Sequence, residues 1–255
     1  IPTLQGKQLL DVEDLDTEKG DLHPVQEAMV KYHGSQCGFC TPGFVMSLFS
    51  MYKNHNSYNN ELIKDSIAGN LCRCTGYRPI IDAAKSLNKI DKSDQFTKNK
   101  KNIIKLLKKI NLKNISIENK GKKYFSPRTI KELKKVIKKN SNSHFLSGGT
   151  DLSLIVTKEK KDINNIINLQ AINELDFIKE KNNNIEVGAA TPLIKFEKFI
   201  LKYYPDFNSV LKRYGSVQIR NVCTIGGNIA TASPIGDTLP ILLSLNSEIV
   251  IETTK

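Results

Sequence analysis

The chain has 255 residues, of which 39% are hydrophobic, enough for one large or two small folded domains. No apolar run approaches the roughly 20 residues that cross a bilayer, so we expect no membrane partner. The formal net charge of +12 comes from lysines spread through Lys- and Asn-rich segments, not from an arginine-rich face interleaved with aromatic residues. We therefore expect a solvated basic surface and no nucleic-acid partner.

The two ends of the sequence suggest a piece of a longer protein. The chain begins at Ile1 rather than at Met, with apolar residues over 1–4, and it ends shortly after a strand-like run over 248–251. Residues 1–12 are predicted to form the last strand of a preceding domain, which leads into an acidic connection. The run over 248–251 is predicted to be a further strand.

Four short helices are predicted next, from apolar residues at helical spacing. Pro24 and Asn59 are expected to open the first and third of them, and Gly69 to end the third. The four helices are predicted over 25–32, 43–52, 59–68 and 80–87.

Four of the five cysteines form two close pairs in the turns between these helices. Cys37 and Cys40 have two residues between them, Cys72 and Cys74 have one, and 31 residues separate the pairs. A Thr and a Pro follow each pair, which predicts a helix N-terminus there, and free N–H groups at such an end favour thiolate. Four thiolates suit either zinc or an iron–sulfur cluster, and spacing alone leaves both open. The odd number of cysteines suits a reducing compartment, so we expect a cytoplasmic protein without disulfides.

The second half of the chain changes character. Residues 89–122 are dominated by Asp, Lys, Asn and Ser, which predicts a linker with one basic surface helix over 103–110. From residue 123 onward helices and strands mix, so the predicted fold class is α+β. Helices are predicted over 126–139, 193–202 and 209–213, strands over 144–146 and 165–169, a helix or strand over 152–156, and a hairpin that joins 175–178 to 185–189.

Two loops with paired glycines lie in this second domain, and Cys223 is predicted to be a buried residue on a strand before the second one. Glycines let consecutive backbone N–H groups point at a phosphate, and hydroxyl and amide side chains add donors. Neither loop fits the Rossmann or the P-loop motif, and a Gly-Gly turn by itself is more often only a turn. The first loop comprises Leu146, Ser147, Gly148, Gly149, Thr150, Asp151 and Leu152, and the second begins with Thr224, Ile225, Gly226, Gly227 and Asn228 and continues to Asp237.

Three segments around the cysteines carry a more specific signal. They read Leu-His-Pro-Val-Gln over 22–26, His-Gly-Ser-Gln-Cys-Gly-Phe-Cys-Thr-Pro-Gly over 33–43, and Gly-Asn-Leu-Cys-Arg-Cys-Thr-Gly-Tyr-Arg-Pro-Ile over 69–80. These segments resemble the second [2Fe–2S] domain of the xanthine dehydrogenase family, and the gap between the pairs also matches. The His-Gly-Ser is closer to xanthine dehydrogenases than to carbon monoxide dehydrogenases or other molybdenum hydroxylases. The resemblance implies a [2Fe–2S] cluster on the four cysteines of the two pairs.

The two glycine loops are similar to those of the FAD domain of molybdenum hydroxylases, which has the vanillyl-alcohol-oxidase or PCMH type of fold. The resemblance implies that residues 146–152 and 224–228 line the FAD pyrophosphate. It also implies that Tyr214 is an aromatic residue near the cofactor and that Asp237 is a cofactor-binding carboxylate. The implied domains are the end of a ferredoxin-like domain over 1–12, an all-α four-helix [2Fe–2S]-binding domain over 13–88, a linker over 89–122, and an α+β FAD-binding domain over 123–255.

The same resemblance implies an electron-transferring subunit of a xanthine dehydrogenase. A large partner subunit would hold the molybdenum cofactor and hydroxylate hypoxanthine or xanthine, while electrons leave through [2Fe–2S] and FAD to NAD. No catalytic residue is then expected in this chain, and Gln36 and Cys74 are expected to lie against the pterin. Two alternatives stay open: a related hydroxylase that acts on an aldehyde, CO or another heterocycle, and a zinc-stabilised module that is not an enzyme.

Overall fold

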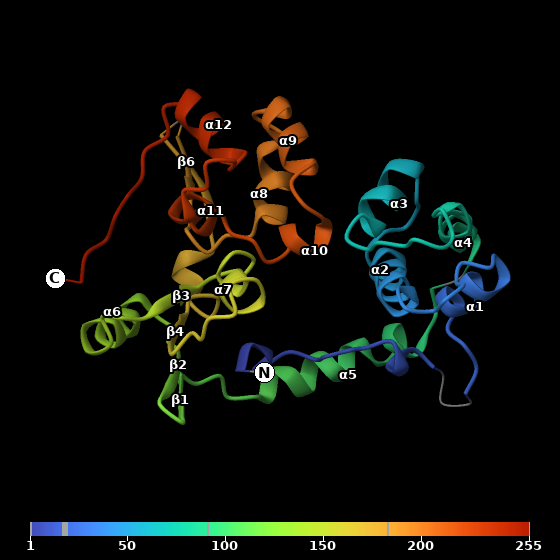
Figure 1. Cartoon of the computed structure of the whole chain (residues 1–255), viewed down its shortest axis with the longest axis horizontal. Coiled ribbons are helices and arrows are strands. Elements are labelled where there is room, and N and C mark those ends of the chain that lie inside the picture. The colour runs from blue at the N-terminus through green and yellow to red at the C-terminus, as the bar shows by residue number, and fades with distance from the viewer. Residues whose placement is uncertain (1, 17–19, 91, 183, 255) are drawn as a thin grey trace. The chain divides into compact units, whose positions relative to one another are not determined.

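The computed structural model describes residues 2–16, 20–90, 92–182 and 184–254 (Figure 1). The chain forms two compact units, Ile1–Leu112 and Lys113–Lys255. Within the described residues, every helix is too short or too polar to span a bilayer.

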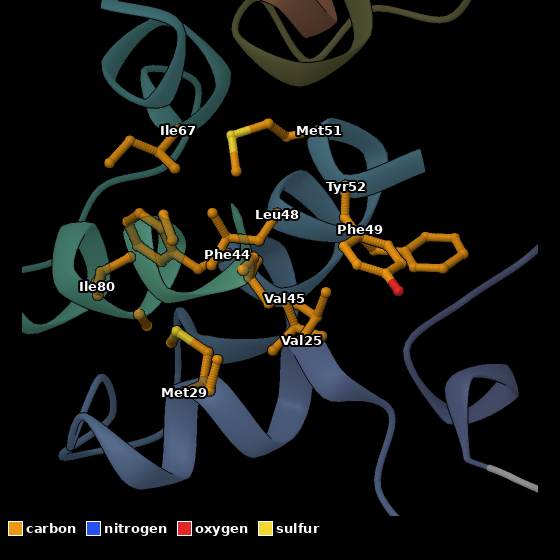
Figure 2. Close-up of a cluster of buried hydrophobic side chains, with 14 of the residues drawn as sticks. Val25, Met29, Phe44, Val45, Leu48, Phe49, Met51, Tyr52, Ile67 and Ile80 are labelled. Atoms are coloured by element: carbon orange, nitrogen blue, oxygen red, sulfur yellow. The ribbon is translucent and has the colours of Figure 1, made fainter. Parts of the chain in front are cut away.

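The first unit is built around four helices, and the four predicted helices are confirmed with small shifts at their ends. Phe44 and Leu48 of the second helix are fully buried, together with Val25 of the first and Ile80 of the fourth, in one apolar cluster (Figure 2). Burial of such side chains is the main stabilising term for short helices that would not persist alone. The helices are α1 (Pro24–Lys31), α2 (Thr41–Asn54), α3 (Asn60–Ile67) and α4 (Arg78–Ser86), and a 3₁₀ turn, η3 (Leu87–Lys89), follows.

Capping side chains explain where two of these helices begin. Asn59 accepts a hydrogen bond from the N–H of Leu62 at 2.8 Å, which confirms the predicted cap of α3. His23 caps α1: its ring Nδ1 accepts from the N–H of Val25, while its own N–H donates to the side chain of Gln26. This histidine is fully buried, so it is a structural residue of the core.

The predicted strand over 1–12 is wrong for the described residues of that segment. Residues 2–12 contain a 3₁₀ turn, η1 (Pro2–Leu4), and a second 3₁₀ turn, η2 (Glu13–Leu15), follows. Leu10 and Val12 pack against the four-helix core, and Leu15 is fully buried in it. A strand needs a neighbouring strand for its backbone groups, and the described part of the first unit contains none.

The segment expected to be a linker carries regular structure. Helix α5 (Gln95–Lys109) replaces the shorter helix predicted over 103–110, and it begins where Asp94 accepts a hydrogen bond from the N–H of Thr97 at 2.7 Å. The same carboxylate lies 2.7 Å from Lys53 Nζ and 3.2 Å from His23 Nε2. Asp94 therefore fastens the start of α5 to the ends of α1 and α2.

The charge on Asp94 is stabilised by its partners. Burial raises the pKa of Asp94, but the bonds from Lys53, Thr97 and His23 outweigh burial and lower the pKa to about 2. A lowered folded-state pKa means that this stabilisation is present above the ordinary value near 4 and is lost as the pH falls through about 2. Burial lowers the pKa of His23, so the ring is held in its neutral form near pH 7.

The second unit contains a four-stranded sheet with the order β1-β2-β4-β3. β1 pairs antiparallel with β2, whereas β4 pairs parallel with both β2 and β3. The helix predicted over 126–139 begins later, because Ser126 still belongs to β2 and the side chain of Thr129 caps the helix. The elements are β1 (Ile115–Asn119), β2 (Lys122–Ser126), α6 (Ile130–Lys139), β3 (His144–Leu146), α7 (Leu152–Thr157) and β4 (Asn165–Asn168).

A hairpin and five helices complete the second unit. The predicted hairpin is confirmed with shifted bounds, and Phe196, Phe207 and Leu211 form the centre of a second apolar cluster. The predicted strand over 248–251 is wrong, since those residues have no regular structure. The elements are η4 (Asn173–Leu175), β5 (Ile178–Lys181), β6 (Asn184–Val187), α8 (Leu193–Ile200), α9 (Pro205–Lys212), α10 (Val217–Arg220), α11 (Ile225–Thr231) and α12 (Thr238–Ser244). The mixture of helices and strands confirms the α+β class.

The anchoring of α5 predicts an unequal response to two aspartate substitutions. Asp94→Ala should lower the free energy of unfolding by about 3 kcal/mol, because it removes a helix cap and leaves Lys53 and His23 without their charged acceptor. Asp82→Ala is the control, since the side chain of Asp82 is 42% exposed and lies 3.9 Å from Lys85, and it should change that energy by less than about 0.5 kcal/mol. Urea denaturation at pH 7 measures both, and equal losses would contradict the anchor.

Candidate functional site

The two cysteine pairs lie in the turns that precede α2 and α4, as predicted. Cys40 is the residue just before α2, and the second pair leads through Tyr77 into α4. Gly38 and Gly76 have φ values of +83° and +65°, a left-handed conformation that glycine adopts without strain. Both turns therefore depend on a glycine beside the cysteines.

The four thiols meet across the two turns. Cys37 hydrogen-bonds with Cys74, and Cys40 with Cys72. Cys37 and Cys74 are exposed, whereas Cys40 and Cys72 are half-buried. Among the described side chains, no three His, Cys, Asp or Glu are set to hold a single metal ion. Two facing pairs of thiols do fit a two-iron cluster, which takes four cysteine ligands.

Hydrogen bonds within the turns favour thiolate on two of the four sulfurs. The hydroxyl and the N–H of Thr75 lie 3.2 and 3.4 Å from Cys72 Sγ, and they lower the pKa of Cys72 to about 7. A backbone N–H two residues along the chain lowers the pKa of Cys37. Burial raises the pKa of Cys40, and the bond with Cys37 raises that of Cys74. Thiolate is the form that binds metal, so this donor set suits iron.

Residues that sequence reasoning did not single out hold the second cysteine turn in place. The hydroxyl of Tyr77 accepts a hydrogen bond from the N–H of Cys72 at 3.0 Å, and Asn70 donates to Ser47 at 2.7 Å. Tyr77 itself has a φ of +67°, which is unusual for a residue with a side chain. Nothing in the local pattern of the sequence signals these contacts, because each depends on the folded turn.

The two glycine loops meet in the second unit. The first loop follows the carboxyl end of β3, and Thr224 of the second donates its hydroxyl hydrogen bond to Ser147 at 3.0 Å, across 77 positions of sequence. A Cβ on Gly148 would lie 2.1 Å from the carbonyl oxygen of Val222, so only glycine fits there. The carboxyl ends of parallel strands are the usual place for a ligand in such sheets.

The second loop forms the start of helix α11, so its backbone N–H groups have partners within the chain. Thr224 caps α11 and accepts from the N–H of Gly227 at 3.1 Å, and Gly226 donates to the carbonyl of Ala189 at 3.0 Å. The N–H groups of residues 225–228 all donate within the chain. These N–H groups are therefore already engaged, and the lining of the FAD pyrophosphate by residues 224–228 stays a prediction.

The first loop keeps the free donors that the second lacks. Gly149 has a φ of +75°, as a sharp turn of backbone N–H groups requires. In the part of the chain that the structure describes, the N–H groups of Gly148, Gly149 and Thr150 have no acceptor. These groups, with the hydroxyl of Ser147, are suitable donors for a phosphate, while Thr224 donates its one hydroxyl proton to Ser147.

The remaining predicted residues are joined by side-chain hydrogen bonds. Tyr214 accepts from Asn228 Nδ2 at 2.9 Å, and Asn228 Oδ1 accepts from the hydroxyl of Thr238, which follows Asp237 at the start of α12. Burial, and next the nearby thiol of Cys223, raises the pKa of Tyr214, so the phenol stays neutral. Thr238 was not singled out from the sequence.

The other predicted positions make fewer contacts. Asp237 and Asp151 precede α12 and α7 without a capping bond from their side chains, and Leu152 begins α7. Cys223 is buried as predicted, but it lies in the turn before α11 and not on a strand.

Two family models match the chain. Residues 11–85 match a [2Fe-2S] binding domain, and residues 114–255, more than half of the chain, match the FAD binding domain in molybdopterin dehydrogenase. The chain belongs to the molybdenum hydroxylase family. The matches confirm two predicted cofactors of this molybdenum hydroxylase region, a [2Fe–2S] cluster and FAD.

Individual relatives agree with this assignment. Xanthine dehydrogenase 1 of Arabidopsis thaliana is 30% identical over 312 residues, which cover 96% of this chain and 23% of that protein. Human aldehyde oxidase is 29% identical over 95% of this chain and 22% of its own length. The chain thus spans less than a quarter of the length of these relatives. A solved structure of CO dehydrogenase from Oligotropha carboxidovorans is 25% identical, with a TM-score of 0.43 over 48% of this chain and 43% of that one.

The facing thiols of this molybdenum hydroxylase chain predict which cysteines hold the cluster. Cys72→Ser should lose iron and acid-labile sulfide, whereas the same change at Cys223, in the other unit, should leave about two of each per chain. Metal and sulfide analysis after anaerobic purification measures both. Retention of iron and sulfide in Cys72→Ser, or stoichiometric zinc without sulfide in the unchanged chain, would exclude these ligands.

Proposed function

We propose that the chain is the electron-transferring part of a xanthine dehydrogenase. Electrons from a molybdenum cofactor, held by a large partner subunit, would pass through the [2Fe–2S] cluster to FAD and then to NAD as hypoxanthine or xanthine is hydroxylated. The observation that carries the proposal is that one chain joins a unit with four facing thiols to a unit that matches an FAD-binding domain. The proposed location is the cytoplasm, in keeping with five cysteines that form no disulfide.

In the first unit, Cys37, Cys40, Cys72 and Cys74 would hold the cluster, which carries single electrons when bound. The bonds from Thr75 to Cys72 Sγ favour negative charge on that sulfur, and hydrogen bonds to the sulfurs are one of the ways in which proteins set a cluster's reduction potential. The chain's own part is therefore to fix four thiolates and tune them.

In the second unit, the first glycine loop would bind the FAD pyrophosphate. The free N–H groups of Gly148, Gly149 and Thr150 supply donors, and Ser147, whose oxygen accepts from Thr224, adds a hydroxyl. Tyr214 and Asp237, close to one another through Asn228 and Thr238, would contact other parts of the cofactor.

The cysteine face is the proposed contact with the partner subunit. Phe39 is 96% exposed and Leu71 84% exposed, beside the exposed Cys37 and Cys74. Large apolar side chains that stay in water next to a redox site are suited to an interface with another protein. Gln36, also exposed, lies in the same turn and would face the pterin.

A second candidate is an aldehyde-oxidising enzyme of the same family, because human aldehyde oxidase is almost as similar as the Arabidopsis xanthine dehydrogenase. The substrate is decided by the partner's active site. A screen of the complete enzyme with purines and aldehydes, and with NAD and oxygen as acceptors, separates the two. Turnover of purine with NAD supports the first proposal, and turnover of aldehydes alone overturns it.

The FAD site predicts the effect of a charge beside Thr224. Gly227→Asp should abolish FAD binding, because a Cβ there would lie 2.8 Å from Thr224 Oγ1, disturb its bond to Ser147, and bring a carboxylate toward the phosphates. Ser141→Asp is the control, since Ser141 is an exposed residue of the same unit and the change adds the same charge. Flavin content of the complete enzyme is the measurement, and stoichiometric FAD in Gly227→Asp would rule out this site.

The electron path predicts that the two cofactors can be separated by mutation. In the complete enzyme, Cys40→Ser should lose the cluster, because a hydroxyl is a far less acidic ligand than a thiol. NADH should still reduce the flavin and an artificial acceptor, while purine-dependent NAD reduction should collapse. Ser50→Ala, on an exposed part of the same helix, is the control and should keep both activities.

The Cys40→Ser result is decisive when subunit assembly and molybdenum content are normal. Under those conditions, purine-to-NAD turnover near the level of the unchanged enzyme, with the cluster absent, would show that this cluster is not on the path. Collapse of purine turnover with intact NADH oxidation supports the path.

A further inference from the structure

A buried ion pair lies behind the proposed FAD site. Arg220, the last residue of α10, is fully buried, and its Nε lies 2.9 Å from Oε2 of Glu197 in α8. Burial of a charge costs free energy unless the charge is paired and hydrogen-bonded, so each of these two residues needs the other. Exchange of such a pair for apolar residues of similar size is often neutral for stability, so stability alone does not account for it.

The guanidinium of Arg220 also holds the backbone that carries Tyr214. Its Nη1 donates to the carbonyl oxygen of Lys212 at 3.2 Å and to that of Tyr214 at 3.3 Å. These carbonyls mark the end of α9 and the turn after it. Because the guanidinium is planar and its donors have fixed directions, it can bind the carboxylate and both carbonyls in one geometry.

From Tyr214 the contacts continue into the second glycine segment. Its hydroxyl accepts from Asn228 at 2.9 Å and lies 3.6 Å from Cys223 Sγ, and Asn228 in turn accepts from Thr238. The ring of Tyr214 is only half-buried, so it retains an accessible side. An unbroken series of contacts thus joins the buried pair to the starts of α11 and α12.

We infer that Arg220 is a positioning residue for the flavin: with Glu197 behind it, it fixes the turn that places Tyr214 and, through Asn228, the segment at Thr224. The inference rests on the proposed FAD site. This role differs from that of a purely structural ion pair. Nε of Arg220 binds Glu197 while Nη1 binds both carbonyls, so all three contacts together need the guanidinium, whereas the ion pair alone needs only a positive charge.

The test compares Arg220→Lys with Arg213→Lys in the complete enzyme. Lysine keeps the charge opposite Glu197, but its single nitrogen cannot replace both Nε at the carboxylate and Nη1 at the two carbonyls. The thermal midpoint should therefore change little while the dissociation constant for FAD rises by at least about tenfold. The visible absorption bands of the flavin that remains bound should shift as well. Arg213 is exposed in the same stretch of chain, so its lysine variant should bind FAD normally.

A double-variant comparison asks whether Arg220 acts through Tyr214. Tyr214→Phe removes the hydroxyl that Asn228 contacts, and combined with Arg220→Lys it should cost no more FAD affinity than the worse single change, because the two act in series. Should Arg220→Lys fail to fold, Arg220→Met with Glu197→Leu removes both charges together and should show the same loss of affinity and the same spectral shift.

Two results would overturn the inference. The first is a folded Arg220→Lys, or the apolar double variant, that binds FAD with unchanged affinity and spectrum. The second is full additivity of Arg220→Lys and Tyr214→Phe. The proposed FAD site is tested separately by Gly227→Asp. If that variant keeps FAD, the site itself falls and the inference with it. If Gly227→Asp loses FAD and Arg220→Lys has no effect, the site stands and the inference alone fails.

Discussion

The second unit depends on a contact between two stretches of backbone. The chain at Gly148 lies directly on the carbonyl of Val222, and any side chain at that glycine would occupy the space of the carbonyl oxygen. Because of this approach, the turn after β3 and the segment before α11 are fixed to each other without a side chain between them. The hydroxyl of Thr224 reaches Ser147 because the backbones at Gly148 and Val222 lie this close together. The approach of Ser147 to Thr224 therefore depends on a residue without a Cβ at position 148.

Features that depend on residues close together in the sequence were predictable. Features that depend on contacts between residues far apart in the sequence were not. Helices α2 and α3, the glycines in the cysteine turns and the buried state of Cys223 all follow from patterns within a few residues. The start of α5 was missed because its polar sequence reads as a linker, while the capping carboxylate of Asp94 has partners on α1 and α2. Apolar runs at both ends of the chain read as strands, but a run becomes a strand only where another strand can pair with it.

The candidate sites show the same division. The cysteine spacing identified the four thiols, yet the pairing of Cys37 with Cys74 is a property of two turns brought together by packed helices. The paired glycines of the second loop suggested a turn of N–H groups around a phosphate. In the structure, Gly226 lies against Ala189, and its N–H donates to the carbonyl of that residue. A Gly-Gly motif reports only that backbone must come close to something, and the fold decides whether that partner is a ligand or the protein itself.

The uneven exposure of the four thiols has a consequence for the order of biogenesis. Cys40 and Cys72 are half-buried whereas Cys37 and Cys74 are exposed, so iron and sulfide from solvent meet the outer pair more readily than the inner one. The exposed ring of Phe39 stands beside this opening. A protein that settled on this face would seal the opening, and a chain sealed while still empty could no longer be filled. If a partner docks on this face as proposed, insertion of the metal centre would have to come first.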